Sequence, residues 1–148
     1  MIEVKDIKKS FGELEVLHGV SLTISEGEIV SIVGASGAGK TTLLQIIGSL
    51  MSADSGDVVI DGVSLGTLPD DALAEFRNKH IGFIFQSYHL LPEFTAVENV
   101  MIPMLIAGIR RKDAEVRARE LLDMVSMSHR AEHKPSASVS YTHLRAHE

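Results

Sequence analysis

Hydrophobic and polar positions alternate at strand spacing near the start of the chain. Residues 2–7 (IEVKDI) and 16–24 (VLHGVSLTI) are rich in β-forming side chains, and the turn-forming SFGE at 10–13 separates them. This pattern predicts two antiparallel strands. The short apolar run EIVSIV at 28–33 predicts a third strand, buried on both faces.

The hydrophobic period changes from that of a strand to that of a helix after residue 40. In KTTLLQIIGSL at 40–50 the apolar side chains recur at helical spacing, namely Leu43, Leu44, Ile46, Ile47 and Leu50. The predicted order is therefore strand, glycine-rich loop, helix.

The middle of the chain predicts a hairpin, a helix and another buried strand. DVVIDGVSL at 57–65 reads as a hairpin because Asp61 and Gly62 tolerate the positive φ values of a tight turn. TLPDDALAEFRNK at 67–79 has an early proline, acids in its first turn and bases in its last, which is typical of a short helix. IGFIF at 81–85 predicts a second buried strand.

Two later segments are apolar in different ways. Residues 111–125 predict a helix with one apolar face, formed by Ala114, Ala118, Leu121, Leu122 and Val125. The most apolar stretch, VMIPMLIAGI at 100–109, contains a proline and has about half the length of a membrane span. Residues 1–13 carry charges and no apolar signal core. We therefore expect a soluble chain that reaches a membrane only through a partner.

Composition narrows the function classes. The 148 residues suit one domain or a piece of a larger one, and 45% hydrophobic with 23% charged residues is typical of a globular chain. A net charge of −6 argues against nonspecific nucleic-acid binding, so no nucleic-acid partner is expected. The absence of cysteine from the sequence excludes disulfides and thiolate metal sites.

The glycine-rich loop GASGAGKTT at 34–42 carries the clearest chemistry. Gly34, Gly39, Lys40 and Thr41 satisfy G-x-x-x-x-G-K-[ST], the phosphate-cradling P-loop. Glycines let successive N–H groups point at one phosphate, and the following helix directs its positive end at the same anion. Lysine at this position bridges β- and γ-phosphate oxygens, and the threonine hydroxyl ligates Mg²⁺.

The dinucleotide fingerprint G-x-G-x-x-G is not met, because the glycines stand at Gly34, Gly37 and Gly39. A Rossmann dehydrogenase is therefore excluded. The flanking pattern of apolar strand and apolar-faced helix is the context that a P-loop requires, which favours phosphate binding over coincidence.

At this point the chain resembles the ATP-binding subunits of ABC transporters. The loop matches the G-x-S-G-x-G-K-[ST]-T of that family, including Ser36. The resemblance implies an ATP site formed by a Walker A set, namely Gly34, Ser36, Gly37, Ala38, Gly39, Lys40, Thr41 and Thr42. Phe11 stands where the family places an aromatic that stacks on adenine; taken alone, a strand-end core residue is the alternative for Phe11.

IGFIFQSYHLLPEFTAVENVMIP at 81–103 resembles the Q-loop region of the same family. The resemblance implies that Gln86 helps to hold Mg²⁺ and the attacking water, so Gln86 and Lys40 are the expected catalytic residues, and Thr41 and Gln86 the metal ligands. A surface glutamine is the alternative for Gln86, but the neighbouring residues fit the same template.

Three segments, FRNKHIGFIFQ, LLPEFTAVENV and SHRAEHKPS, are especially similar in sequence to the ATPases of lipoprotein-releasing transporters. Related subunits of macrolide-export and cell-division complexes share much of this sequence. The resemblance covers residues 1 to about 136 and implies the N-terminal part of an ABC ATP-binding domain. Residues 137–148, from the ASVSYTHLRAHE end, match neither the family nor a helical period, and we expect a non-native or disordered tail there.

The resemblance implies an α/β fold, a P-loop NTPase core of the ABC ATPase type. It adds an antiparallel β-subdomain at residues 1–24 and 57–65 and a partial helical subdomain at about 88–130, with the C-terminal part missing. It also implies a homodimer of ATP-binding subunits and transmembrane permease partners, which place the protein at the cytoplasmic face of the bacterial inner membrane. The apolar residues 99–109 then either lie beneath those partners or belong to the core of the helical subdomain.

The Ser-Gly-Gly signature, and an apolar strand ending in Asp-Glu, are absent from the sequence. ATP hydrolysis requires a carboxylate for the water and another for Mg²⁺, so we expect weak ATP binding and negligible hydrolysis by residues 1–148 alone. A non-catalytic nucleotide binder that sequesters a transporter subunit is thus the second hypothesis.

Two remaining readings are weaker. A GTPase would specify guanine through Asn-Lys-x-Asp, whereas NKHI at 78–81 ends in isoleucine, and a kinase leaves the Q-loop region unexplained. Histidine pairs four residues apart, His129 with His133 and His143 with His147, lack the H-E-x-x-H form of a zinc site. Scattered surface histidines are the better interpretation.

Overall fold

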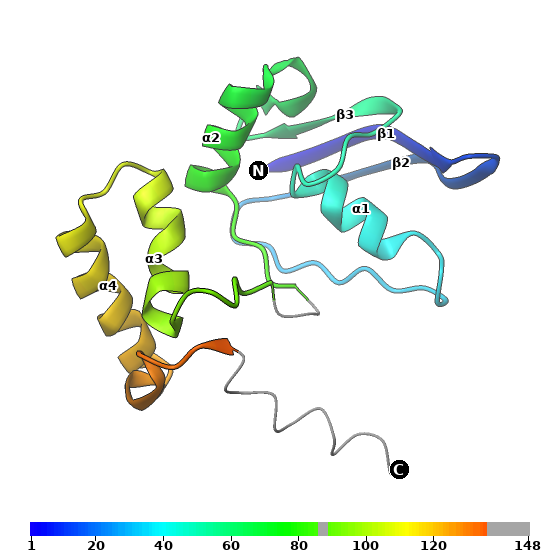
Figure 1. The fold of residues 1–148 in the computed structure, drawn as a ribbon. Helices are drawn as coiled ribbons and strands as arrows, with labels where there is room; N and C mark the ends of the chain where they lie inside the picture. Colours follow the sequence, from blue (N-terminus) through cyan, green and yellow to red (C-terminus); the bar gives the residue numbers. More distant parts are fainter. Residues whose placement is uncertain (86–88, 136–148) are drawn as a thin grey trace, which may run out of the picture. The chain divides into compact units, whose positions relative to one another are not determined.

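The chain divides into two units, Met1–Phe83 and Ile84–Glu148, which are treated separately below. The structure, a computed structural model, describes residues 1–85 and 89–135 (Figure 1).

The first unit contains a four-stranded antiparallel sheet (Figure 1). Its strands are β1 (Ile2–Phe11), β2 (Leu14–Ile24), β3 (Ser55–Ile60) and β4 (Val63–Ser64), in the order β2-β1-β3-β4. The predicted strand pair and hairpin are confirmed. Between β3 and β4, Asp61 and Gly62 have φ values of 47° and 81°, the two positive values that a tight hairpin turn requires.

The central strand β1 is bulged, and glycines on both neighbouring strands make room for the bulge. Asp6 has a positive φ of 50°, and the register of β1 shifts against β2 and β3 on either side of this residue. A Cβ atom on Gly56 of β3 would lie 2.4 Å from the carbonyl oxygens of Lys5 and Asp6. On β2, a Cβ atom on Gly19 would lie 2.5 Å from Asp6 Oδ1. Backbone contact requires glycine at Gly56, and the positive φ of 91° favours glycine at Gly19, where the Asp6 side chain could move aside.

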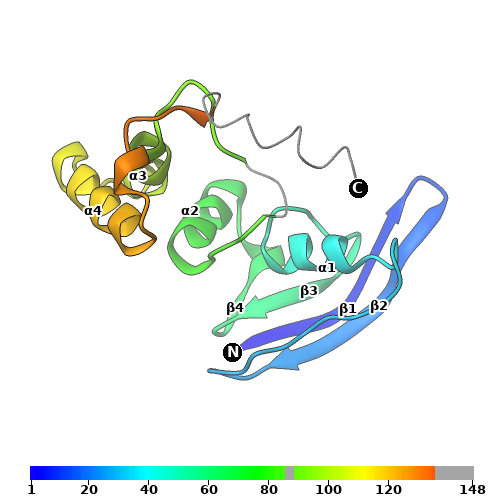
Figure 2. The ribbon, with the colours of Figure 1, turned by 90° about the horizontal axis from the view of Figure 1, so that it is seen from below.

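Helix α1 (Lys40–Ile47) packs on one face of this sheet (Figure 2). Its buried side chains, Leu43 and Ile46, join residues of the sheet and of the following turn in one core. The other members of this core are Val4, Ile7, Leu17, Val58, Ile60 and Leu65. The predicted helix is confirmed, although Leu44 remains exposed at its surface.

The two predicted buried strands are not formed. Neither 28–33 nor 81–85 is a strand in the described part of the chain, and Ile29 and Ile84 are both 98% exposed. A strand buried on both faces needs strands beside it and layers above and below it, and the described residues pair no strand with either segment. Ile32 alone of the first segment packs partly against the core.

Helix α2 (Asp70–His80) begins three residues later than predicted, after the short 3₁₀ turn η1 (Leu65–Thr67). Pro69 stands at the N-cap with an extended backbone, which explains the later start. Asp70 and Asp71 follow in the first turn and Lys79 stands in the last, the charge order that favours the helix dipole.

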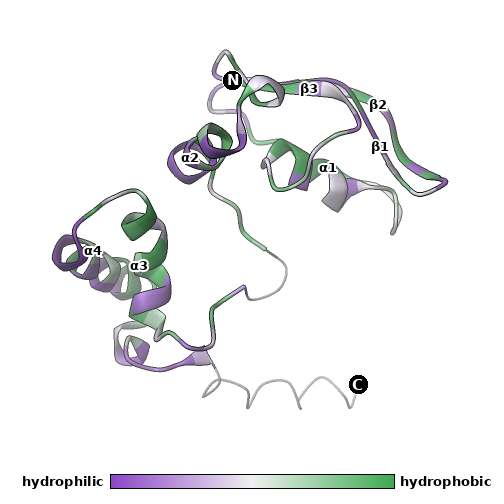
Figure 3. Ribbon diagram, turned by 45° about the horizontal axis from the view of Figure 1, so that its top comes forward, coloured by the Kyte–Doolittle hydropathy of each residue, from purple (hydrophilic) through white to green (hydrophobic). Residues whose placement is uncertain are grey.

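The second unit is built on a helix pair, α3 (Ala96–Ile106) and α4 (Arg111–Met124), followed by the 3₁₀ turn η2 (Ser128–Arg130). Figure 3 shows α3 as mostly hydrophobic and α4 as largely hydrophilic. The buried core consists of Val97, Met101, Ala114, Ala118, Leu122 and Ala131. The predicted helix at 111–125 is thus confirmed, except that Val125 lies past its end and is exposed.

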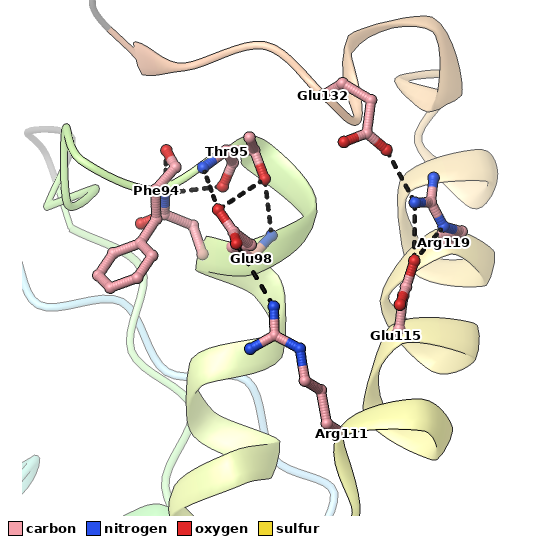
Figure 4. Close-up of polar contacts among 8 residues, drawn as sticks. Phe94, Thr95, Glu98, Arg111, Glu115, Arg119 and Glu132 are labelled. Atoms are coloured by element: carbon pink, nitrogen blue, oxygen red, sulfur yellow. Dashed lines mark hydrogen bonds and ion pairs between the residues drawn. The ribbon is translucent and has the colours of Figure 1, made fainter.

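A capping box fixes the start of α3 (Figure 4). The Glu98 backbone N–H donates to the Thr95 hydroxyl at 3.3 Å, and the Thr95 backbone N–H donates to Glu98 Oε2 at 2.9 Å. Arg111, at the start of α4, lies 3.5 Å from Glu98 Oε1 and links the two helix ends. Farther along α4, Arg119 pairs with Glu115 on the same helix and with Glu132 after η2.

Replacing Glu98 with glutamine should flatten the acid dependence of stability. The Thr95 backbone N–H, the Thr95 hydroxyl and Arg111 lower the pKa of Glu98 below its ordinary 4.5. This carboxylate therefore contributes stability that is fully present above about pH 4.5 and is lost as pH falls through the lowered pKa. Glutamine keeps the capping acceptor without the charge.

Urea denaturation at pH 7, 5, 4 and 3 measures this effect. As pH falls below about 4.5, the free energy of unfolding should decrease more in the wild type than in Glu98→Gln. Above that pH it should change with pH to the same extent in both proteins. Glu120→Gln, which removes the exposed partner of Arg117 on α4, is the matched control for the loss of one surface carboxylate. Parallel curves for Glu98→Gln and the wild type would contradict the prediction.

Candidate phosphate-binding site

The loop that precedes α1 turns sharply at two glycines. Gly37 and Gly39 have φ values of 79° and 81°, in the left-handed region that other residues enter only with strain. A Cβ atom on Gly37 would meet no described atom within 4 Å, so backbone conformation alone requires glycine there. The left-handed backbone of the loop at this point therefore explains why residue 37 is a glycine.

Gly39 is needed for a second reason, its contact with the sheet. A Cβ atom there would lie 2.9 Å from Val16 Cγ1 and from Leu17 Cδ2, both on β2. The loop and the first turn of α1 thus rest directly on this strand. Any larger residue would push the loop away from β2 as well as strain its backbone.

Lys40 folds back over the loop instead of extending into solvent. Its Nζ donates hydrogen bonds to the Gly34 carbonyl at 2.9 Å and to the Ala35 carbonyl at 2.6 Å. The ammonium group is therefore held at the mouth of the loop, where it supplies a fixed positive charge.

The N-terminus of α1 is open to an anion. Gly39 is the N-cap, no side chain among the described residues caps the helix, and its first turn holds no acidic residue. The first N–H groups of a helix lack intrahelical partners, and the helix dipole adds positive potential at this end. Together with Lys40, this arrangement suits a phosphate group.

The remaining predicted site residues lie at or near the same surface. Ser36, Ala38 and Thr41 are exposed, and Thr42 is half-buried in the first turn of α1. The Thr41 hydroxyl is an oxygen donor of the kind that Mg²⁺ prefers. Gln86 lies outside the described residues.

Phe11 ends β1 and is 48% exposed, which does not fit the alternative of a strand-end core residue. Lys9 Nζ lies 5.8 Å from the centre of this ring. An exposed aromatic ring with a cation near it is available for stacking on another flat group.

Asn99 is a residue of the second unit that the sequence did not single out. Its side-chain N–H groups donate to the carbonyls of Leu91, Phe94 and Thr95 at 2.9–3.1 Å, and its Oδ1 accepts from the Leu91 backbone N–H at 2.8 Å. Asn99 thereby fixes the turn at 91–95, which leads from the predicted Q-loop into α3. An asparagine in the first turn of a helix is the sequence signal that was available.

The described residues offer no competing metal site and no membrane helix. No three His, Cys, Asp or Glu side chains are grouped as metal ligands within residues 1–85 and 89–135, where His129 and His133 lie. His143 and His147 fall outside the described residues. In that same part of the chain, no helix has the length and hydrophobicity needed to cross a membrane.

Comparison with known proteins identifies the class to which this fold and loop belong. The sequence profile of the family described as "ABC transporter" matches residues 17–145, and the chain therefore belongs to the ABC transporter family. The lipoprotein-releasing system ATP-binding protein LolD of Bacteroides fragilis (strain YCH46) is 57% identical over 136 residues. LolD of Porphyromonas gingivalis (strain ATCC BAA-308 / W83) is 60% identical over 136 residues.

These alignments cover 92% of the chain, which spans only 63% and 62% of the two LolD proteins. The macrolide export ATP-binding/permease protein MacB of Shigella flexneri is 47% identical over 140 residues, which are 22% of its length. A dimeric, post-hydrolysis structure of the ATP-binding cassette MJ0796 bound to ADP and Pi has a TM-score of 0.84 at 40% identity. It covers 92% of the chain, which spans 62% of that cassette. The predicted fold class, the α/β P-loop NTPase of the ABC ATPase type, is thereby confirmed.

Proposed function

We propose that the chain is the N-terminal part of an ATP-binding and ATP-hydrolysing subunit of an ABC transporter that drives lipoprotein release from the bacterial inner membrane. The observation that carries the nucleotide site is the loop geometry, with Lys40 held over Gly34 and Ala35 beside the open N-terminus of α1. The cargo is supported by 57–60% identity to two LolD proteins.

Different residues are proposed to contact different parts of ATP. Backbone N–H groups of the loop surround the phosphates, and Lys40 neutralises the β- and γ-phosphate charge. Phe11 stacks on adenine. The residues proposed for the nucleotide are Phe11, Gly34, Ser36, Gly37, Ala38, Gly39, Lys40, Thr41 and Thr42.

Thr41 and Gln86 are the proposed ligands of Mg²⁺, and Gln86 also orients the attacking water. When bound, the ion neutralises charge that develops on the phosphate oxygens. The exposed hydroxyl of Thr41, one residue after Lys40, fits this role.

The proposed assembly is a homodimer of ATP-binding subunits with transmembrane permease partners, at the cytoplasmic face of the inner membrane. The dimeric state of the similar cassette supports the homodimer. Residues 137–148 are proposed to be non-native, which leaves 1–136 as the ATP-binding part.

Genetic complementation tests the proposal that the transported cargo is a lipoprotein. The complete reading frame that contains these codons should restore lipoprotein release and growth to a Bacteroides strain depleted of LolD, and Lys40→Ala in that frame should not. The same frame should leave a macrolide-export defect uncorrected. Correction of macrolide export without lipoprotein release would favour the alternative of a macrolide-export ATPase, to which the 47% identity with MacB points.

Residues 1–148 alone should bind ATP weakly without turnover, because the sequence supplies no Asp-Glu pair after an apolar strand. Equilibrium binding of fluorescent ATP, combined with a phosphate-release assay, separates binding from hydrolysis. Phosphate release by this chain above the level of Lys40→Ala would overturn that part of the proposal.

A further inference from the structure

Lys9 lies between the ring of Phe11 and a carboxylate. Its Nζ is 5.8 Å from the ring centre and 2.7 Å from Asp54 Oδ1. The Lys9 side chain is only 16% exposed, whereas its two partners are about half exposed. The ammonium group of a strand lysine usually extends into water, so the low exposure of Lys9 needs a cause.

Asp54 supplies that cause because it is itself fixed to β1. Its backbone N–H donates to the Lys8 carbonyl at 2.9 Å, and its Oδ2 accepts from the Ser10 backbone N–H at 2.7 Å. Bonding to Lys9 and then to Ser10 lowers the pKa of Asp54, so the group is a carboxylate at neutral pH. A carboxylate held from two sides fixes the lysine that pairs with it.

The position of Lys9 has a consequence for the ring. A cation over an aromatic face is attracted by the ring quadrupole, and this attraction selects among the side-chain rotamers of Phe11. Such an attraction would orient the ring before any ligand arrives. Preorganisation of this kind raises affinity because less conformational freedom is lost on binding.

We propose that Lys9, held by Asp54, is a positioning residue that orients the Phe11 ring and covers one of its faces, so that the base of the nucleotide stacks on the opposite face. This inference rests on the proposed function, in which Phe11 contacts adenine. It adds a residue whose ammonium group lies over the aromatic ring and leaves the phosphates to the P-loop.

Nuclear magnetic resonance of the unliganded chain tests the geometry without any nucleotide. The ε-methylene protons of Lys9 should be shifted upfield by the Phe11 ring current. Phe11→Leu should return them to the position of an exposed lysine, and Asp54→Asn should return them part of the way. Lys9 signals that are unshifted in the wild type would overturn the inference.

Binding measurements test the consequence for the base. The ratio of the dissociation constant of tripolyphosphate to that of ATP isolates what the nucleoside adds, since both ligands occupy the phosphate loop. Lys9→Met should lower this ratio about two- to fivefold, the strength of an exposed cation–π contact, and Lys9→Arg should restore it. Lys5→Met is the matched control for charge, because Lys5 lies on the same strand and pairs with Glu3.

The outcomes separate the inference from the function on which it rests. An unchanged or increased ratio in Lys9→Met, with ATP still bound, would overturn the role of Lys9 alone. Failure of the wild type to bind either ATP or tripolyphosphate would overturn the proposed function and this inference with it.

Discussion

Replacing Lys40 with alanine should weaken ATP binding about ten- to one-hundredfold. Hydrogen bonds to charged groups are each worth about 1.5–3 kcal/mol, and the lysine lies where it neutralises phosphate charge directly. The Gly34 and Ala35 carbonyls hold the Lys40 amine in place, so little conformational freedom is lost when it pairs with phosphate. Titration with fluorescent ATP at fixed ionic strength measures the effect.

Lys79→Ala is the matched control for the loss of Lys40. It removes the same charge from the first unit and breaks an exposed pair with Glu75 within α2. ATP affinity within about twofold of the wild type is expected for this control, because screened surface charges contribute little. A Lys40→Ala protein that binds ATP as tightly as Lys79→Ala would remove the main support for the proposed nucleotide site.

Local patterns made several elements predictable. The turn at Asp61 and Gly62 requires only its own two residues and the flanking strands, and helix α4 carries its buried face in its own period. The conformation of the glycine loop was predictable for a related reason, since its left-handed positions, Gly37 and Gly39, are glycines of the motif itself.

Local sequence patterns do not predict contacts between residues that are far apart in the chain. The apolar run at 28–33 predicts a buried strand, yet the outcome depends on partners that the run itself does not contain. The bond from Lys9 to Asp54 spans 45 positions and gives no periodic signal. The sequence pattern does not predict the packing of Gly39 on Val16 either, although the glycine itself was expected from the loop motif.

Gly56, the glycine on β3 opposite the β1 bulge, should tolerate substitution least in the sheet. Gly56→Ala places a methyl group 2.4 Å from two backbone carbonyl oxygens, those of Lys5 and Asp6, while φ stays near 90°. Left-handed strain costs about 1–2 kcal/mol and overpacking about 1–3 kcal/mol, so we expect a loss of about 2–5 kcal/mol in the free energy of unfolding. Backbone atoms of the central strand cannot rotate away as a side chain does.

Gly62→Ala separates the two contributions to that loss. Gly62 has a similar φ of 81°, but a methyl group there would meet no described atom within 4 Å. The control should therefore lose only about 1–2 kcal/mol, from strain alone. Urea denaturation of both variants with equal m-values measures the difference. Equal losses would show that β1 shifts to accept the methyl group, and the bulge would then be a yielding feature of the sheet instead of a fixed one.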